Sequence, residues 1–87
     1  MESGRAFWVY MLRCGDGTLY SGITNDLDKR VAAHESGRGA RYTRGRGPLR
    51  LVYREEVKDK SAALKREHAL KRLPRAQKLA LVRKGPR

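Results

Sequence analysis

The sequence predicts a small α+β fold, in which a three-stranded antiparallel sheet is flanked by helices in the chain order β-β-α-β-α-α. Three observations carry this prediction. An apolar segment, Phe7 to Leu12, is followed by turn residues and by a second strand-like segment, Thr18 to Ile23. In a later segment, Leu49 to Val57, a half-buried strand is expected, with Leu49, Leu51 and Tyr53 on one face and Arg50, Val52 and Arg54 on the other. The remaining segments place apolar residues at helical spacing.

The chain is expected to form a single domain over residues 1–87, because this length lies near the lower limit for independent folding and contains no repeat or linker. A core of this size leaves little room for an enclosed pocket. A shallow surface site is therefore expected.

Positive charge dominates the composition and is concentrated toward the C-terminus. Twenty-one Lys and Arg oppose nine Asp and Glu, which gives a net charge of +12. Lys58 to Arg87 contributes +9 of this charge and the first 57 residues contribute +3. Such a field attracts polyanions, so nucleic acid is favoured as a partner over a merely solvated basic face, and RNA is not excluded beside DNA.

Cys14 is the single cysteine, which excludes an intramolecular disulfide and a cysteine metal site. No apolar run has transmembrane length and no leader has a hydrophobic core, so no membrane partner is expected. These features predict a cytoplasmic protein, with association with the nucleoid left open.

The first strand, Phe7 to Leu12, is apolar without alternation, which is typical of a central strand covered on both faces. Gly15-Asp16-Gly17 supplies turn residues between the first two strands. A three-residue loop places Tyr10 and Tyr20 on the same face of the sheet, whereas a two- or four-residue loop would separate them. We expect the three-residue loop.

The next segment predicts a helix that Asn25 or Asp26 caps and Gly37 ends. Its inward stripe is formed by Leu27, Val31 and His34. Arg30 lies beside this stripe, one turn from His34. Arg30 offers planar donors suited to a phosphate, and His34 can accept a proton at neutral pH.

Each of these polar residues also has a structural explanation. Arg30 can pair with Asp26, a lone helical histidine is often structural, and aromatic residues fill strands for packing reasons. A tyrosine hydroxyl can act as a base only if nearby cations lower its pKa from about 10.

The stretch from Arg38 to Gly47 is rich in arginine and glycine and lacks phosphate-cradle spacing. We expect it to grip a nucleic-acid backbone, with Tyr42 available for stacking on bases, rather than to be a disordered basic loop. The residues expected to bind DNA are Arg38, Arg41, Tyr42, Arg44 and Arg46, joined by Lys71 from a later helix.

After the third strand, a helix is predicted from about Asp59 to Leu73, capped by Asp59 or Ser61. Pro74 is expected to be the first residue of a last helix, which ends before Gly85-Pro86.

Glu67 lies against the pattern of its own helix. Its neighbours at i−4, i−3 and i+3 are Ala63, Leu64 and Leu70, so the carboxylate lies on or beside the stripe that should face the sheet. A salt bridge to Lys71 or Arg30 is the ordinary explanation. Because an unpartnered buried charge is costly, a divalent cation is the alternative, and Mg²⁺ accepts one or two carboxylates while it retains several waters.

In order and spacing, these residues resemble the GIY-YIG nuclease superfamily, in particular its small stand-alone bacterial members of the YhbQ type. The two motifs correspond to Trp8-Val9-Tyr10 and Tyr20-Ser21-Gly22. The helical arginine, histidine and glutamate of the family correspond to Arg30, His34 and Glu67. The resemblance extends from residue 7 to about residue 81.

The resemblance implies the sheet order 2-1-3 and metal-dependent hydrolysis of DNA phosphodiester bonds. It implies that Glu67 binds Mg²⁺ or Mn²⁺, that Arg30 stabilises the phosphate in the transition state, and that Tyr10 acts as general base or orients water. Tyr20 and His34 would position phosphate and water. The first motif lacks its glycine and has valine for isoleucine, and the second has serine for isoleucine, all mainly at packing positions.

Two functions remain open from the sequence. The first is a DNA endonuclease, which by analogy would act in repair or recombination and could take its specificity from a partner protein. The second is a nucleic-acid-binding module of the same fold with weak or no catalysis. The sequence favours the endonuclease, because apolar residues would pack better than Glu67 in a site that had lost its activity.

Overall fold

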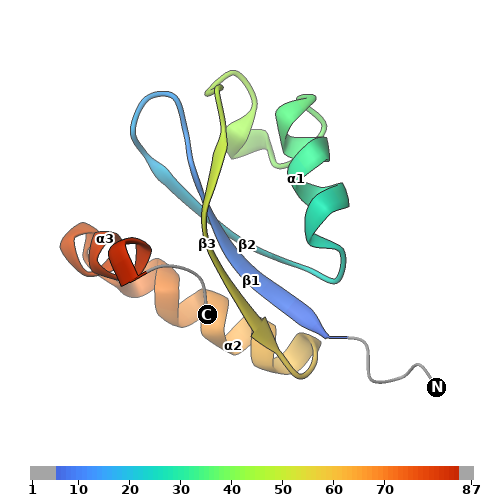
Figure 1. Cartoon of the computed structure of the whole chain (residues 1–87), viewed down its shortest axis with the longest axis vertical. Coiled ribbons are helices and arrows are strands. Elements are labelled where there is room, and N and C mark those ends of the chain that lie inside the picture. The colour runs from blue at the N-terminus through green and yellow to red at the C-terminus, as the bar shows by residue number, and fades with distance from the viewer. Residues whose placement is uncertain (1–5, 85–87) are drawn as a thin grey trace.

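A computed structural model describes residues 6–84 of the chain. Three strands form one antiparallel sheet in the order β2-β1-β3, as the sequence predicted. One helix covers one face of the sheet and two helices cover the other (Figure 1). The elements in chain order are β1 (Phe7–Arg13), β2 (Leu19–Thr24), α1 (Leu27–Glu35), the 3₁₀ turn η1 (Arg41–Thr43), β3 (Arg50–Val57), α2 (Lys60–Arg72) and α3 (Arg75–Lys84).

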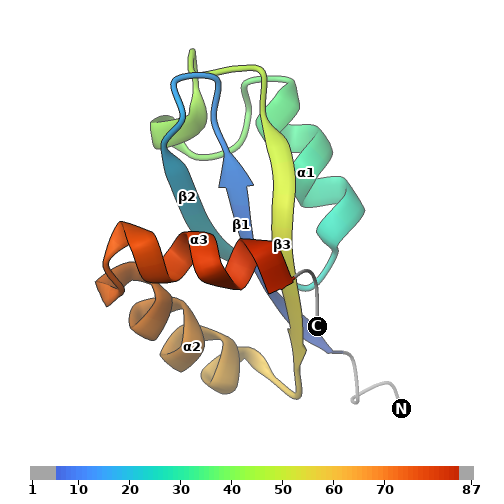
Figure 2. The same cartoon turned by 60° about the vertical axis from the view of Figure 1, so that its left-hand side comes forward.

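The central strand β1 is buried on both faces, which explains its unbroken apolar sequence. Val9 and Met11 pack with residues of α2. Helix α3 lies on the same side of the sheet and packs against this cluster through Leu81 and Val82 (Figure 2). Tyr10 and Leu12 point to the opposite face, where they pack with Leu27 at the start of α1. The chain therefore builds two small cores, one on each side of a single sheet.

The turn between β1 and β2 has the predicted three-residue loop. The amide of Cys14 donates to the carbonyl of Thr18 at 2.9 Å, and Gly17 adopts a φ of +87°, which a residue with a side chain rarely does. In this register Tyr10 pairs with Gly22, two positions along from Tyr20. Tyr10 and Tyr20 therefore lie on the same face, as predicted.

Strand β3 departs from the predicted alternation. Met11 pairs with Tyr53 while the next residue of β1 pairs with Leu51, so Val52 is an extra residue at a β-bulge. As a result Leu51 packs on the α1 side and Tyr53 on the α2 side. The prediction that these two residues share a face was wrong, because one inserted residue reverses the parity of the strand.

The helix boundaries follow the predicted caps. Asp26 accepts the amide of Lys29 at 3.1 Å and so caps α1, and Gly37 follows the helix with a φ of +82°. Asp59, rather than Ser61, caps α2 by accepting the amide of Ala62 at 2.8 Å.

Pro74 immediately precedes α3 instead of opening it, and its carbonyl accepts the amides of Gln77 and Lys78. The predicted stop at Gly85-Pro86 lies outside the described residues. Within residues 6–84, no helix combines the length and hydropathy needed to cross a membrane. Cys14 is a buried free thiol.

Candidate active site

The site is built around the hydroxyl of Tyr10, a fully buried residue of the central strand. The phenol extends across the neighbouring strand at Gly22, where a Cβ would lie only 2.6 Å from the hydroxyl oxygen. Carbon and oxygen atoms in contact are normally about 3.5 Å apart, so only glycine leaves room here. The glycine of the second motif therefore makes space for the tyrosine of the first.

Arg30 and His34 converge on this hydroxyl from α1. The Nε2 atom of His34 lies 2.9 Å from the Tyr10 oxygen, and Nε of Arg30 donates to the same oxygen at 3.4 Å. The i,i+4 spacing places both side chains over one spot, as the sequence indicated. Within residues 6–84, no ion pair joins Arg30 to Asp26, the alternative weighed from the sequence.

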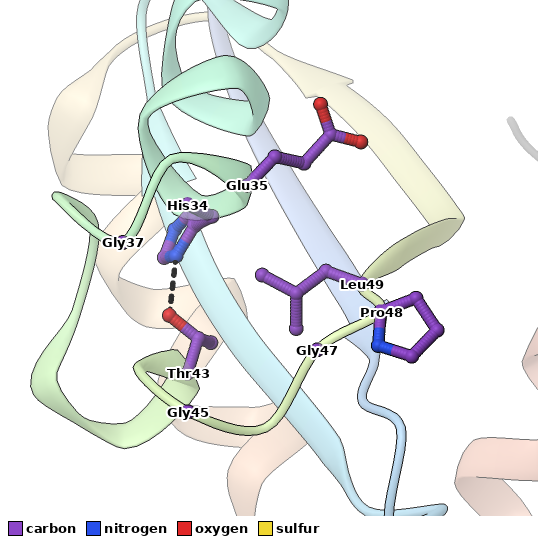
Figure 3. A pocket seen from close by; sticks show the side chains of 8 residues that line it. All are labelled: His34, Glu35, Gly37, Thr43, Gly45, Gly47, Pro48 and Leu49. Atoms are coloured by element: carbon purple, nitrogen blue, oxygen red, sulfur yellow. Dashed lines mark hydrogen bonds between the residues drawn. The ribbon is translucent and has the colours of Figure 1, made fainter.

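His34 is buried and its second ring nitrogen is also bonded. Nδ1 lies 2.8 Å from the hydroxyl of Thr43, which belongs to the basic loop (Figure 3). Gly39 passes so close to the imidazole that a Cβ there would overlap the ring. A depression of about 310 Å³ borders this pair and is open to solvent on the loop side.

Tyr20 completes an aromatic cluster around the histidine. Its ring centre lies 5.3 Å from that of His34 and 6.5 Å from that of Tyr10. Its other neighbour is Tyr42, which stacks on it at 5.8 Å. The structure thus brings together four of the five residues that the sequence nominated: Tyr10, Tyr20, Arg30 and His34.

Glu67, the fifth nominated residue, belongs to α2, which packs mainly against β2 and β1 and covers the face of the sheet opposite α1. Its side chain is only 13% exposed and forms an ion pair with Lys71 at 3.2 Å. None of the described hydrogen bonds links Glu67 to the other four residues. Burial is the main cause of the raised pKa of Tyr10, and the negative charge of Glu67 is the smallest of the causes that raise it.

Burial sets the protonation of the site. It raises the pKa of the Tyr10 hydroxyl, and the hydrogen bond from Arg30 only partly offsets this effect. Burial, followed by the charge of Arg30, lowers the pKa of His34 from 6.5. At neutral pH the pair therefore consists of a protonated phenol and a neutral imidazole. The hydrogen bond from Arg30 therefore does not by itself make the Tyr10 hydroxyl a base.

Among the five candidate-site residues, Glu67 is the carboxylate that could bind a metal ion. Within residues 6–84, no group of three His, Cys, Asp or Glu side chains could enclose a cation. A zinc site needs three or four nitrogen or sulfur ligands and does not fit. Mg²⁺ or Mn²⁺ fits, because a hard cation can take Glu67 as its protein ligand and keep water and phosphate oxygens as the others.

The basic loop is tied to the hairpin by Arg46. Its guanidinium forms an ion pair with Asp16 and lies 4.4 Å above the ring of Tyr42. Hydrogen bonds from the hydroxyl and amide of Thr18, with a smaller contribution from Arg46, lower the pKa of Asp16 to about 2. Tyr42 is therefore covered by Tyr20 on one face and by Arg46 on the other.

This arrangement changes the prediction for the DNA-binding residues. Tyr42 is 41% exposed but has no free face for a base unless Arg46 moves. Lys71 likewise has a partner in Glu67. The remaining arginines of the set have exposed positions on the loop: Arg38, Arg41 and Arg44.

Two residues that contribute to the site could not be identified from the sequence. Thr43 lies in the arginine- and glycine-rich stretch, and no local pattern indicates that its hydroxyl meets a histidine nine positions away. Gly39 likewise looked like a flexible loop residue, whereas its lack of a side chain admits the imidazole. Both roles depend on how the loop folds back over α1.

The chain matches a known protein family over most of its length. Residues 6–80 match the family described as the GIY-YIG catalytic domain. The match covers most of the chain, and the chain therefore belongs to the GIY-YIG family of nucleases.

Individual proteins are also similar to this chain in sequence. The chain is 53% identical over 75 residues to a UPF0213 protein of Natronomonas pharaonis, covering 86% of this chain and 88% of the relative. It is also 53% identical to a UPF0213 protein of Clostridium perfringens, covering 86% of this chain and 81% of the relative.

Two solution structures determined by NMR share the fold. The UPF0213 protein of Bacillus halodurans superposes with a TM-score of 0.57 at 47% identity, over 88% of this chain and 82% of that one. A protein of E. faecalis superposes with a TM-score of 0.60 at 34% identity, over 93% and 88% of the two chains.

Proposed function

We propose that this protein is a metal-dependent endonuclease that hydrolyses DNA phosphodiester bonds, with a role in DNA repair or recombination. The observation that carries the proposal is the Tyr10 hydroxyl, which is bonded to a neutral His34 and to Arg30. The half-buried carboxylate of Glu67 on α2 adds a small contribution to the raised pKa of this hydroxyl. This set combines a route for a proton, a cation for a phosphate and a ligand for a divalent ion.

In the proposed reaction, Tyr10 passes its proton to Nε2 of His34 as it takes one from the attacking water. The water oxygen forms a bond to phosphorus while the bond to the leaving sugar oxygen breaks, and solvent supplies a proton to that oxygen. Arg30 faces the phosphate, where its fixed positive charge stabilises the additional negative charge of the transition state. Tyr20 lies beside His34 and orients the phosphate and water.

Glu67 would hold Mg²⁺ or Mn²⁺. Such an ion, when bound, stabilises negative charge on the phosphoryl oxygens. Glu67 must first exchange Lys71 for the ion. That exchange leaves the Lys71 ammonium available for a phosphate of the DNA backbone.

DNA binding is assigned to the basic loop and Lys71. Exposed arginines on the loop, Arg38, Arg41 and Arg44, would contact phosphates directly. Arg46 would contact the backbone after it leaves Asp16, and this movement would uncover one face of Tyr42 for stacking. A partner protein would supply specificity for a particular DNA structure.

The test is a cleavage panel of branched, nicked and plasmid DNA with Mg²⁺ or Mn²⁺. Glu67→Gln preserves the shape of the side chain and removes its charge, so cleavage should fall on the order of 10²-fold or more, because the main protein ligand for the ion is lost. Glu56→Gln is the matched control, since Glu56 is an exposed carboxylate on β3. Equal cleavage by the wild type and the Glu67 variant would exclude this mechanism.

The ion pair between Glu67 and Lys71, together with the raised pKa of Tyr10, favours a second candidate. In the absence of substrate both groups are held in unreactive forms, which suits a nucleic-acid-binding module with weak catalysis. Binding that weakens steeply with salt, without metal-dependent nicking of any substrate in the panel, would select this alternative.

A further inference from the structure

We propose that Thr43 is a positioning residue of this site. Its hydroxyl holds His34 in the tautomer that carries the proton on Nδ1, which leaves Nε2 free to accept the proton of Tyr10. Thr43 does this from within the basic loop, so that the loop expected to contact DNA also sets the proton acceptor. The catalytic consequence rests on the proposed function, whereas the tautomer itself does not.

Thr43 is buried, and its hydroxyl makes two hydrogen-bond contacts. The residue is 2% exposed and His34 is 1% exposed. Oγ1 lies 2.8 Å from Nδ1 of His34 and donates to the carbonyl of Ala40 at 3.0 Å. The Glu35 carboxylate, next to His34 in sequence, points away from this pair (Figure 3).

The tautomer follows from the number of donors and acceptors. A hydroxyl has one hydrogen, and a neutral imidazole has one N–H and one acceptor nitrogen. If Thr43 donates to Ala40, its oxygen accepts the Nδ1–H of His34. Nε2 is then an acceptor, and Tyr10 donates its hydroxyl hydrogen to it at 2.9 Å while its oxygen accepts from Arg30. Both buried hydroxyl hydrogens find an acceptor in this arrangement.

The opposite tautomer satisfies fewer buried groups. With the proton on Nε2, His34 would donate to Tyr10, and none of the described hydrogen bonds provides another acceptor for the buried Tyr10 hydrogen. Its gain would be the contact from the amide of Ala40 to Nδ1, which is 3.4 Å long and only partly buried. A buried unsatisfied hydroxyl costs about 1–3 kcal/mol, more than a hydrogen bond at that distance contributes.

The loop around Thr43 is fixed on both sides. Gly39 packs against the imidazole, and Arg46 is anchored to Asp16 on the hairpin. The neighbours of Thr43 along the chain, Arg41 and Arg44, are the exposed candidates for phosphate contact. A phosphate that binds these arginines therefore acts on the segment that orients His34.

The groups that face His34 from each packed element are Tyr10 on β1, Tyr20 on β2, Arg30 on its own helix and Thr43 on the loop. Arg30 is the charged member of this set. Thr43→Val keeps the shape of the side chain but removes the acceptor for Nδ1–H. The ring is then expected to move its proton to Nε2, where it donates to Tyr10 and no longer accepts from it.

The first experiment measures the tautomer in the metal-free protein by NMR with ¹⁵N-labelled histidine. The chain has two histidines, and the exposed His68 is an internal reference. His34 should be the Nδ1–H tautomer in the wild type, in Thr43→Ser and in the control Ser36→Ala, which loses an exposed hydroxyl at the end of α1. Thr43→Val should shift His34 toward the Nε2–H tautomer.

An Nε2–H tautomer in the wild type, or an unchanged tautomer in folded Thr43→Val, would overturn the proposal. Should Thr43→Val fail to fold, the wild type and Thr43→Ser still decide, because the proposal requires Nδ1–H in both. The readout needs no nuclease activity, so failure of the proposed function would be seen separately in the cleavage panel.

The second experiment applies if the panel detects cleavage. Thr43→Val should lower kcat on the order of 10-fold to 100-fold with little change in KM, which is at or below the lower end of the full contribution of general acid–base catalysis, because the histidine itself is still present. Thr43→Ser should restore kcat. The acid limb of the pH profile of kcat should also move in Thr43→Val and not in Ser36→Ala. A loss that Thr43→Ser fails to restore would mean that Thr43 serves packing alone.

Discussion

The contact between Gly22 and Tyr10 provides a sharp test of the site, through the variant Gly22→Ala. The added Cβ would lie 2.6 Å from the Tyr10 oxygen, 2.7 Å from Cζ and 3.1 Å from Cε1. Normal contact distances are about 3.5 Å or more, so the phenol must retreat by roughly 1 Å. Tyr10 is fully buried on the central strand, so neighbouring side chains must move with it.

The expected loss of stability is about 1–3 kcal/mol, the usual cost of overpacking a core. For a domain of this size each kcal/mol lowers Tm by about 4–8 °C, so Tm should fall by roughly 5–20 °C. A shift of this size would disrupt the geometry of the 2.9 Å bond between Tyr10 and His34. Activity should therefore fall even at temperatures where the variant is folded.

The assay is thermal unfolding followed by circular dichroism, with cleavage measured well below Tm. Gly47→Ala is the control for stability, because a Cβ there meets nothing within 4 Å. Its Tm should stay close to that of the wild type. A Gly22→Ala protein with wild-type Tm and wild-type cleavage would refute the proposed packing of the phenol over β2.

Three further predictions follow from the same site. Tyr10→Phe leaves Nε2 of His34 without its buried partner, so urea unfolding should report a loss of about 1–3 kcal/mol, and cleavage should fall on the order of 10²-fold or more; an equally stable variant would contradict the bond. Because the pKa of His34 lies below 6.5 in the folded state, the contribution of neutral His34 to the free energy of unfolding is fully present above pH 6.5 and is lost as the pH falls from 6.5 toward the lowered pKa. Denaturant unfolding at a series of pH values should show this loss, and the loss should be smaller in His34→Gln. Arg41→Ala should reduce the slope of log K against log salt by about 1 in DNA-binding titrations, whereas an unchanged slope would remove Arg41 from the interface.

Much of the fold could be predicted because the signals are local. Strand and turn patterns fix the hairpin, and the three-residue loop alone decides that Tyr10 and Tyr20 share a face. Asp26 and Asp59 cap the helices that they precede. The i,i+4 spacing of Arg30 and His34 likewise follows from the helix itself.

What the sequence could not supply depends on which segments the fold brings together. The bulge at Val52 arises from packing β3 against β1, so the alternation of its own side chains did not reveal it. The cover of Tyr42 by Arg46 depends on an ion pair with Asp16, thirty positions away. Contacts between residues so far apart in the chain leave no trace in the spacing of apolar residues along one strand or helix.

The sequence by itself nominated the residues proposed to carry the chemistry: the two tyrosines, Arg30, His34 and Glu67, a carboxylate that lies beside the apolar stripe of its helix. The tertiary structure alone decided their state. Burial raises the pKa of Tyr10 and lowers that of His34, and Thr43 reaches the histidine from a loop. The reason is that residue types and spacings are properties of the chain, whereas desolvation and hydrogen-bond partners exist only once distant segments have packed.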